Sequence, residues 1–402
     1  MQGVDSQRAW LVVVGTFFSS FVTLGTAYSF GAFFTEMSAE FDSNRAATSV
    51  IFGLTTFAFF WLSLITGRLA DRYGPRVVLL CGAAFMCAGL LATSQVQSLV
   101  LGYVTYGVGV GVAAAAGYIP MVAAVGGWFE RHRATAVGIA VAGIGAGTLV
   151  ISPTSAALID RFGWRDTFVV YAIAGPAVLI VCALLVDRPP GQIADQPSRA
   201  REALASPVFR RLQLSAQCSG LALFVPFVFV GQYAEERGVG SVAAAVLVGL
   251  LGGASVLARI GFGSAVRRFG SVRLYRTSFG LLGASFLVWL VAGSSYVVLV
   301  AFVVVLGIGY GGFVALSTIV AAERFGVVGL GTILGLFYTT QGLGGLVGPP
   351  VAGAVIDAAD AYWPVILACV VLEAGALLLI RDLPVRPDGS LEPEPGATTA
   401  TA

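Results

Sequence analysis

Twelve apolar segments, each about 20 residues or longer, constrain the fold of this chain more than any other feature of its sequence. They are separated by short charged stretches and fall near residues 9–34, 46–69, 76–95, 98–127, 134–159, 165–186, 212–234, 240–264, 271–293, 296–322, 327–356 and 362–380. Each is long enough to cross a bilayer as a helix, which satisfies its own backbone hydrogen bonds within lipid. Charged residues make up only 11% of the chain, against roughly 25% in soluble domains. The sequence therefore predicts an all-α membrane protein with twelve transmembrane helices.

A charged stretch with several prolines separates the sixth apolar segment from the seventh. This composition is typical of a solvated linker. We expect residues 1–187 and 212–382 to form two six-helix bundles, joined by a cytoplasmic linker over residues 188–211. Residues 383–402 are rich in Pro, Glu, Gly and Thr, and we expect them to form a disordered cytoplasmic tail.

The two groups of six segments resemble each other at nearly one offset. Gly67–Gly74 aligns with Gly263–Gly270, 196 positions later. A second match, 197 positions apart, pairs Gly145, Gly147, Pro153, Ile159 and Asp160 with Gly342, Gly344, Pro350, Ile356 and Asp357. Two independent matches indicate an internal repeat, so the bundles should be pseudo-symmetric. A parallel repeat of this kind is typical of carriers whose two halves rock about a site near the membrane midplane.

Arginine is concentrated in the loops on one side of the predicted bundles, and all 23 basic residues are Arg. The loops after the second, fourth and eighth segments and the linker hold most of them, whereas acidic residues are frequent in the opposite loops. By the positive-inside rule, we expect both termini to be cytoplasmic in a multi-pass protein of the cell (plasma) membrane.

The stretch Gly67–Arg76, GRLADRYGPR, is similar to the signature loop between helices 2 and 3 of the major facilitator superfamily, and the resemblance covers nearly the whole chain. It implies that Asp71 braces the start of helix 11 in one of two access states, and that Gly67 and Arg72 belong to the same coupling motif. A carboxylate is favoured beside the positive end of a helix dipole, which agrees with this role. The second copy has Arg267 at the place of Asp71, so only the first copy can form the brace.

One charged residue interrupts the apolar run near the inner end of the eighth segment. Arg259 cannot lose its charge and is costly at bilayer depth. On a helix, Ser255 and Gly252 share its face, which is small and slightly polar, as a cavity lining would be. The alternative is that Arg259 snorkels to the cytoplasmic headgroups. Because Gly263 and Ser264 still separate it from the loop, we predict that Arg259 binds a ligand.

Three tyrosines fall at a depth similar to that of this guanidinium. Counted from the outer end of each segment, Tyr118, Tyr310 and Tyr338 lie within about 10 Å of its height, at 1.5 Å per residue. In the superfamily, their helices line the central cavity, so three phenols and one guanidinium are expected to face one volume. Gln341 and Gln217 are further candidates. The alternative for each Tyr is packing, with its hydroxyl bonded to nearby backbone.

A finer resemblance concerns the substrate. Ser255–Arg259 and Arg8–Phe34 look like helices 8 and 1 of the monocarboxylate transporter family, which carries lactate and pyruvate with a proton. The family's essential helix-8 Arg falls on Arg259, its helix-8 Asp on Ser255 and its helix-1 Lys on Tyr28. These residues complete the predicted substrate-binding set. Tyr28 lies only six residues from the outer end of the first segment, so we expect it at an outer gate.

These observations predict a secondary active transporter that moves a short monocarboxylate, such as L-lactate or pyruvate, with a proton by alternating access. One cation suits one carboxylate, and a dianion would leave a charge uncompensated. The proton site stays open, because the family's Asp is absent. Glu373 is the one carboxylate well inside an apolar segment, but the resemblance implies that its helix, the twelfth, lies outside the helices that line the cavity. The alternative is that substrate and proton enter together, and the sequence leaves coupling to sodium open.

Two other functions are compatible with the sequence: an anion exchanger of the oxalate and formate type, and a non-transporting nutrient sensor. The absence of a second intramembrane cation disfavours the exchanger. The chain has no nucleotide-binding loop, no metal-ligand cluster and no Ser or Cys paired with a His, so we expect no enzyme, cofactor or metal. Its net charge of +2 gives no indication of nucleic-acid binding, and we expect a monomer to suffice.

Overall fold

The structure, a computed structural model, describes residues 5–189, 204–326, 330–386 and 391–392. Within these ranges it is helical apart from turns, loops and one isolated β-bridge between Val385 and Leu391. The N-terminal bundle contains α1 (Gln7–Tyr28), α2 (Gly31–Glu40), α3 (Arg45–Tyr73), α4 (Pro75–Ser94), α5 (Leu99–Gly102), a π-helical turn (Tyr103–Val108), α6 (Gly109–Gly117), α7 (Ile119–Trp128) and α8 (Arg133–Leu185). The C-terminal bundle contains α10 (Pro207–Leu223), α11 (Val225–Glu235), α12 (Ser241–Phe269), α13 (Ser271–Leu290), α14 (Tyr296–Phe325), α15 (Leu330–Ala359) and α16 (Trp363–Leu379).

These elements form twelve membrane-spanning helices. Nine stretches of described helix are long and apolar enough to cross a membrane. One of them, α8, is two helices that meet at Gly163, whose φ of 81° is not helical. The remaining two spans are α13, with 20 residues, and the apolar α16, with 17. The predicted fold class, two six-helix bundles of a membrane protein, is confirmed.

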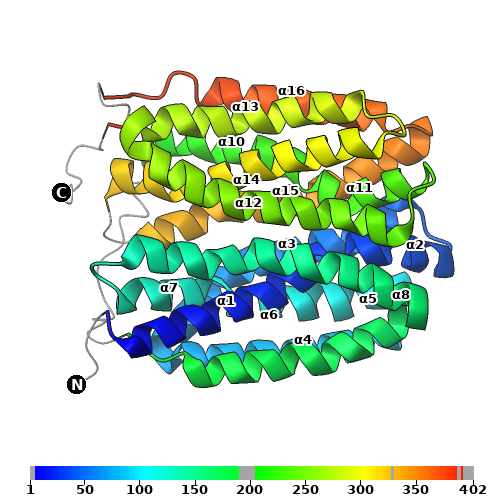
Figure 1. Ribbon diagram of the computed structural model, residues 1–402, viewed down its shortest axis with the longest axis horizontal. Coiled ribbons are helices and arrows are strands. Elements are labelled where there is room, and N and C mark those ends of the chain that lie inside the picture. Colours follow the sequence, from blue (N-terminus) through cyan, green and yellow to red (C-terminus); the bar gives the residue numbers. More distant parts are fainter. Residues whose placement is uncertain (1–4, 190–203, 327–329, 387–390, 393–402) are drawn as a thin grey trace.

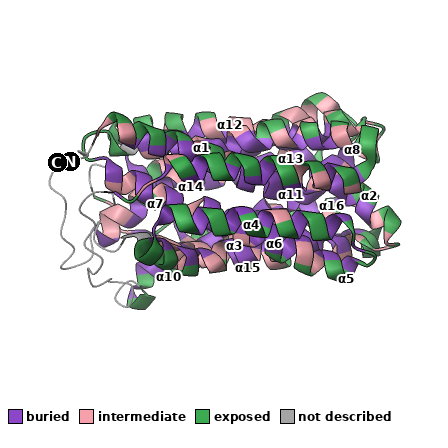
Figure 2. Cartoon of the chain, turned by 90° about the horizontal axis from the view of Figure 1, so that it is seen from below, coloured by how far each residue is buried: buried purple, intermediate pink, exposed green. Residues whose placement is uncertain are grey.

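All these helices run roughly along the long axis of the molecule, and the two bundles lie side by side (Figure 1). We call the end with the start of α1 and the turn at Gly270 the terminal face, and the opposite end, with the end of α2 and the turn at Gly163, the distal face. Buried residues face the interior, and exposed residues lie on the outward sides of the helices (Figure 2). Many exposed side chains are large and apolar, including Leu257 and Val297. Such a surface is favourable against lipid.

Two helix pairs form most of the interface between the bundles: α3 with α15, and α8 with α12. Small residues allow the close approach. A methyl group on Gly145 of α8 would lie 2.3 Å from the Gly252 carbonyl oxygen of α12. Its repeat partner Gly342 faces α3, where an added methyl group would lie 3.0 Å from the Trp61 side chain. The glycines matched in the repeat therefore serve at symmetry-related contacts, where a larger residue would force the helices apart.

Three spans break near their middle. The breaks lie between α1 and α2 at Ser29–Phe30, between α6 and α7 at Tyr118, and between α10 and α11 at Phe224. Pro120 and Pro226 follow the second and third breaks and cannot donate a backbone hydrogen bond. Irregular backbone at membrane depth is tolerated where it is buried in protein or lines a cavity. The breaks therefore indicate where a site lies.

The linker and tail differ in part from expectation. Helix α10 begins at Pro207, inside the stretch 188–211 assigned to the linker, and residues 190–203 lie outside the described residues. The expected disorder of 383–402 does not hold for residues 383–386 and 391–392. The Leu391 N–H donates to the Glu323 carboxylate at the end of α14, at 2.9 Å, and Leu391 is buried. The reason is that backbone hydrogen bonds tie this part of the tail to the bundle.

Candidate functional site

A central cavity lies at the three helix breaks, between the two bundles. Its empty volume is about 440 Å³. The wall is mainly aromatic and apolar, with residues from seven of the spans: Leu24, Tyr28, Phe59, Phe60, Tyr118, Ile119, Ile144, Phe224, Tyr310, Phe313, Val314, Tyr338 and Gln341. The breaks turn Tyr118 and Phe224 out of regular helix and onto this wall. This is the composition of a small-molecule site, apolar with a few polar groups.

The four tyrosines of the predicted set all lie on the cavity wall. Tyr338 stacks on Phe60 across the interface, with ring centroids 6.2 Å apart, and its hydroxyl donates to the Val314 carbonyl oxygen at 3.4 Å. This long bond, a hydrogen bond with the Thr318 side chain and the packing of the ring on Phe337 at 5.3 Å agree with the packing alternative for Tyr338. The structure therefore brings these phenols together, as the depth argument expected.

Tyr28 lies deeper than expected. Sequence placed it six residues from the end of the first span, but the span continues through α2 to Glu40. Its ring packs 4.9 Å from that of Phe227, in the other bundle, and its hydroxyl interacts with that of Tyr310. The expected position at the outer end was wrong, because the break at Ser29–Phe30 interrupts the span without ending it.

Arg259 is 9% exposed and points toward the other bundle, not toward lipid. Its Nη1 donates to the Val141 carbonyl oxygen of α8 at 2.9 Å. Its Cζ lies 5.7 Å from the ring centroid of Tyr310, which lines the cavity. Among the described residues, Nε and Nη2 have no hydrogen-bond partner. The snorkelling alternative does not describe this conformation. The two unpaired donors are buried, and Arg259 is not itself a lining residue, so its link to the cavity is the contact with Tyr310.

Ser255 does not join this group. Its hydroxyl donates to the Gly252 carbonyl oxygen of its own helix at 2.7 Å, and it is fully buried. Gln341 does line the cavity, but its side-chain amide donates to the Ala216 carbonyl oxygen at 2.7 Å. Gln217 is not among the lining residues.

Among the described residues, the side-chain hydrogen bonds between α8 and α12 lie at Arg259 and on its distal side. Toward the distal face the two helices are joined by hydrogen bonds, from Ser152 to the Ala245 carbonyl at 3.0 Å and from Ser241 to Asp160 at 2.6 Å. Toward the terminal face, a side chain added at Gly138 or Gly263 would meet no described atom within 4 Å. At the other helix pair the contact continues past the site, since an added methyl group on Gly335 of α15 would lie 2.7 Å from the Leu64 side chain of α3.

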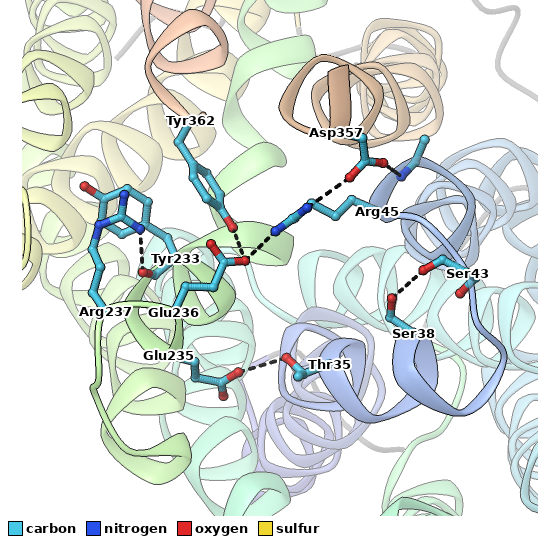
Figure 3. A network of polar contacts seen from close by, with 11 residues as sticks. Thr35, Ser38, Ser43, Arg45, Tyr233, Glu235, Glu236, Arg237, Asp357 and Tyr362 are labelled. Carbon is cyan, nitrogen blue, oxygen red and sulfur yellow. Dashed lines mark hydrogen bonds and ion pairs between the residues drawn. The ribbon is translucent and has the colours of Figure 1, made fainter. Parts of the chain in front are cut away.

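On the distal face, ion pairs connect the two bundles (Figure 3). Arg45, at the start of α3, contacts Glu236 at 2.7 Å and Asp357, at the end of α15, at 3.1 Å. The Tyr362 hydroxyl also donates to Glu236, at 2.9 Å. Sequence reasoning missed Arg45. Asp357 was the available signal, because its repeat partner Asp160 makes the equivalent contact to Ser241.

The signature loop is exposed at the terminal face. Asp71 interacts electrostatically with Arg188, whose Nη2 donates to the Arg72 carbonyl oxygen. Residues 327–329, which precede α15, lie outside the described residues, and no hydrogen bond joins Asp71 to the described part of α15. The brace expected from Asp71 therefore stays a prediction for the other access state. Gly67 faces open space, with no described atom within 4 Å of an added methyl group.

Comparisons with known proteins agree with this architecture. The family model of the Major Facilitator Superfamily matches residues 16–275 and 218–401. Monocarboxylate transporter 3 of Rattus norvegicus is 31% identical over 89% of this chain and 76% of its own length. Monocarboxylate transporter 12 of Xenopus laevis is 28% identical over 89% of this chain and 85% of its own length.

Solved structures of the same fold include a bacterial homolog of the human lysosomal transporter Spinster and a D-xylose-proton symporter. Their TM-scores are 0.72 and 0.71, each at 15% identity; they cover 92% and 96% of this chain, and 95% and 98% of their own. Together with the twelve helices, the repeat and the central cavity, these matches show that the chain belongs to the major facilitator superfamily of transporters and is similar to its monocarboxylate transporters.

Proposed function

We propose that this transporter moves a short monocarboxylate, such as L-lactate or pyruvate, together with a proton by alternating access. The observation that carries the proposal is the unpartnered edge of Arg259. Nε and Nη2 form one side of the planar guanidinium, and two parallel N–H bonds from such an edge match the two oxygens of a carboxylate. The third nitrogen, Nη1, is held by Val141, which fixes the direction in which this edge points.

The charge balance supports a monoanion. Among the described residues, no cationic side chain lines the cavity itself, and Arg259 lies behind its wall, against Tyr310. An anion with one carboxylate neutralises Arg259 in a setting of low dielectric constant, whereas a dianion would leave one charge buried and uncompensated. The anion-exchanger alternative, with oxalate as substrate, is disfavoured for this reason.

The cavity wall supports a substrate with an apolar part. The rings of Tyr310 and Phe313 offer apolar contact to a methyl group, and the tyrosine hydroxyls are within the same volume for a hydroxyl or keto oxygen. Tyr310 lines the cavity and its ring centroid lies 5.7 Å from the Arg259 Cζ, so we assign it contact with the bound carboxylate. Tyr118, Tyr338 and Tyr28 lie on the same wall, so we assign their hydroxyls to hydrogen bonds with the hydroxyl or keto oxygen of the substrate.

Alternating access follows from the interface. The ion pairs of Arg45 join the bundles on the distal side, whereas α8 and α12 share no hydrogen bond between described residues on the terminal side of Arg259. In the other state we expect the distal ion pairs to break and Asp71 to brace helix 11. We further propose that the terminal face is cytoplasmic, in the cell membrane, and that one chain forms the working unit.

The test is uptake of radiolabelled L-lactate into proteoliposomes under an imposed pH gradient. We expect gradient-driven uptake by the parent, loss with Arg259→Ala, and severe loss with Arg259→Lys, because an ammonium cannot make the planar bidentate contact. Arg273→Ala, which removes an exposed guanidinium on α13, is the matched control and should transport normally.

The other outcomes are equally informative. Binding of lactate without uptake would identify a sensor. Uptake of oxalate in exchange for formate, without lactate uptake, would identify the anion exchanger. Lactate uptake that is indifferent to Arg259→Ala would remove the proposed site.

A further inference from the structure

The C-terminal bundle buries a carboxyl group that the transport site does not use. Glu373 lies in α16 and is 1% exposed. Its Oε1 accepts a hydrogen bond from the Ser219 hydroxyl of α10 at 2.8 Å. Its Oε2 has no hydrogen-bond partner among the described residues. An ionisable group at this depth is costly and therefore indicates a function.

No described group around Glu373 would balance the negative charge of an ionised carboxylate. The titratable groups that interact with it are two thiols, Cys218 of α10 and Cys369 of its own helix. From α13 it meets Gly283, where an added methyl group would lie 3.4 Å from the Glu373 Cβ. Within the described part of the chain, it forms no ion pair. An ionised carboxylate here would have one hydrogen bond and no counter-ion, so the neutral acid suits this conformation.

Helix α10 connects this group to the cavity. Ser219, which holds Glu373, is followed by Gly220, where an added methyl group would lie 3.1 Å from the side-chain oxygen of Gln341. Gln341 lines the cavity and donates to α10. Helix α10 then ends at the break beside Phe224, which is also on the cavity wall.

We propose that Glu373 is the proton-binding site of the transport cycle, an inference that rests on the proposed proton-coupled function. In the loaded state, Oε2 carries the proton and Oε1 accepts from Ser219. The Oε2–H bond forms when the carboxylate takes up a proton from solvent on one side, and it breaks when that proton leaves on the other. Movement of α10 that follows substrate binding changes the shielding of Glu373, and this couples the proton to the substrate.

The variant that tests the site is Glu373→Gln, which resembles the protonated acid and keeps an oxygen for Ser219. Two assays are compared in proteoliposomes. Exchange of labelled for unlabelled L-lactate at equal pH does not require the proton to leave, so exchange should stay within about twofold of the parent. Accumulation driven by a pH gradient requires proton release, so the accumulation ratio should fall to about one. Glu36→Gln, which neutralises an exposed carboxylate on α2, is the matched control and should keep both activities.

The outcomes distinguish a failure of the proton site from a failure of the proposed transport function. If the parent transports lactate and Glu373→Gln still accumulates it under the gradient, the proton site is wrong and the proposed function stands. The proton then enters with the substrate at the cavity. A Glu373→Gln protein that elutes as a folded monomer but has lost exchange also contradicts the proposal. If the parent moves no lactate at all, both proposals fall.

A second variant keeps the test informative if Glu373→Gln does not fold. Ser219→Ala removes only the donor to Oε1 and leaves the carboxyl group in place. It should keep lactate exchange while the pH dependence of gradient-driven uptake shifts from that of the parent. An unchanged pH dependence would count against Glu373.

Discussion

The two bundles place different groups at equivalent positions. Where the C-terminal bundle has Arg259, the N-terminal bundle has Ser63, 196 positions earlier. Ser63 donates its hydroxyl to the Phe59 carbonyl oxygen of its own helix at 2.6 Å. Arg259 has to reach Val141 in the other bundle and still keeps two donors without partners among the described residues. One position is satisfied within its helix, whereas the other is incomplete without a ligand.

The same contrast recurs in the last helix of each bundle. Glu373 is 197 positions after Pro176, which lies within α8 and has no ionisable side chain. Both ionisable groups of the proposed mechanism therefore belong to the C-terminal bundle. The N-terminal bundle contributes aromatic rings and phenols to the cavity, and it holds the copy of the signature loop with Asp71. The two halves share one scaffold because of the repeat. The groups proposed to bind substrate and proton are found at positions where the two halves differ.

The largest expected effect comes from the matched pair Arg259→Met and Ser63→Ala. Loss of two charge-assisted hydrogen bonds, worth roughly 1.5–3 kcal/mol each, should reduce lactate uptake by about 100-fold or more. Ser63→Ala should change uptake less than about twofold, since its bond is local. The measurement is the initial rate of uptake in proteoliposomes.

The stability of the substrate-free protein should not fall along with the uptake rate when Arg259 is replaced. Arg259 is buried with unpartnered donors, so Arg259→Met should leave the Tm of the substrate-free protein unchanged or raise it. L-Lactate should raise the Tm of the parent and not that of the variant. A large fall in Tm for Arg259→Met would instead indicate that the guanidinium is a structural group.

Next in size is the effect of opening the distal face. Arg45→Ala removes two partly exposed ion pairs between the bundles, each worth roughly 0.2–1 kcal/mol, and should shift the balance of access states by about two- to thirtyfold. Ser241→Ala removes only the single hydrogen bond to Asp160 and should shift it less. Spin labels at the exposed residues Asp166 and Val297, with native cysteines replaced by serine, would report the separation of the bundles. An Arg45→Ala distance distribution identical to that of the parent would show that these pairs do not hold the distal side closed.

A smaller effect is expected at the signature loops. Asp71→Asn should slow lactate uptake by about two- to fivefold, because a carboxylate beside a helix start is worth roughly 0.3–1 kcal/mol. Arg267→Ala, at the equivalent place in the second copy, should leave the uptake rate unchanged. Equal slowing by the two variants would contradict the asymmetry between the copies.

The smallest effect is expected at the N-terminus of the first bundle. Asp5 accepts the backbone N–H groups of Arg131 and His132, at 3.1 and 3.4 Å, and the hydrogen bond from Arg131 lowers the pKa of Asp5 below its usual value. Its contribution to stability is present above the pKa of the unfolded chain and is lost as pH falls through the lowered pKa. Asp5→Asn should therefore lower the Tm slightly at neutral pH and not at strongly acidic pH. A Tm difference that is independent of pH would exclude the ionised carboxylate as the cause.

Much of the site could be found from the sequence because depth along a helix depends only on counting. That reasoning brought Tyr118, Tyr310 and Tyr338 to one height, and the structure places all three on one wall. The same counting misplaced Tyr28, since a break within a span is not visible as the end of an apolar run. It also passed over Arg45, whose partners are about 190 and 310 positions away in the sequence.

The amino-acid sequence by itself determined the number of spans, the two-fold repeat and the single guanidinium at depth, because hydropathy and repeat spacing are properties of short stretches. The tertiary structure decided which edge of Arg259 is free, and that Glu373 faces α10 instead of lipid. Those facts depend on the rotation of each helix about its axis and on its neighbours. Contacts between helices that are distant in the sequence set both, and no local pattern records them.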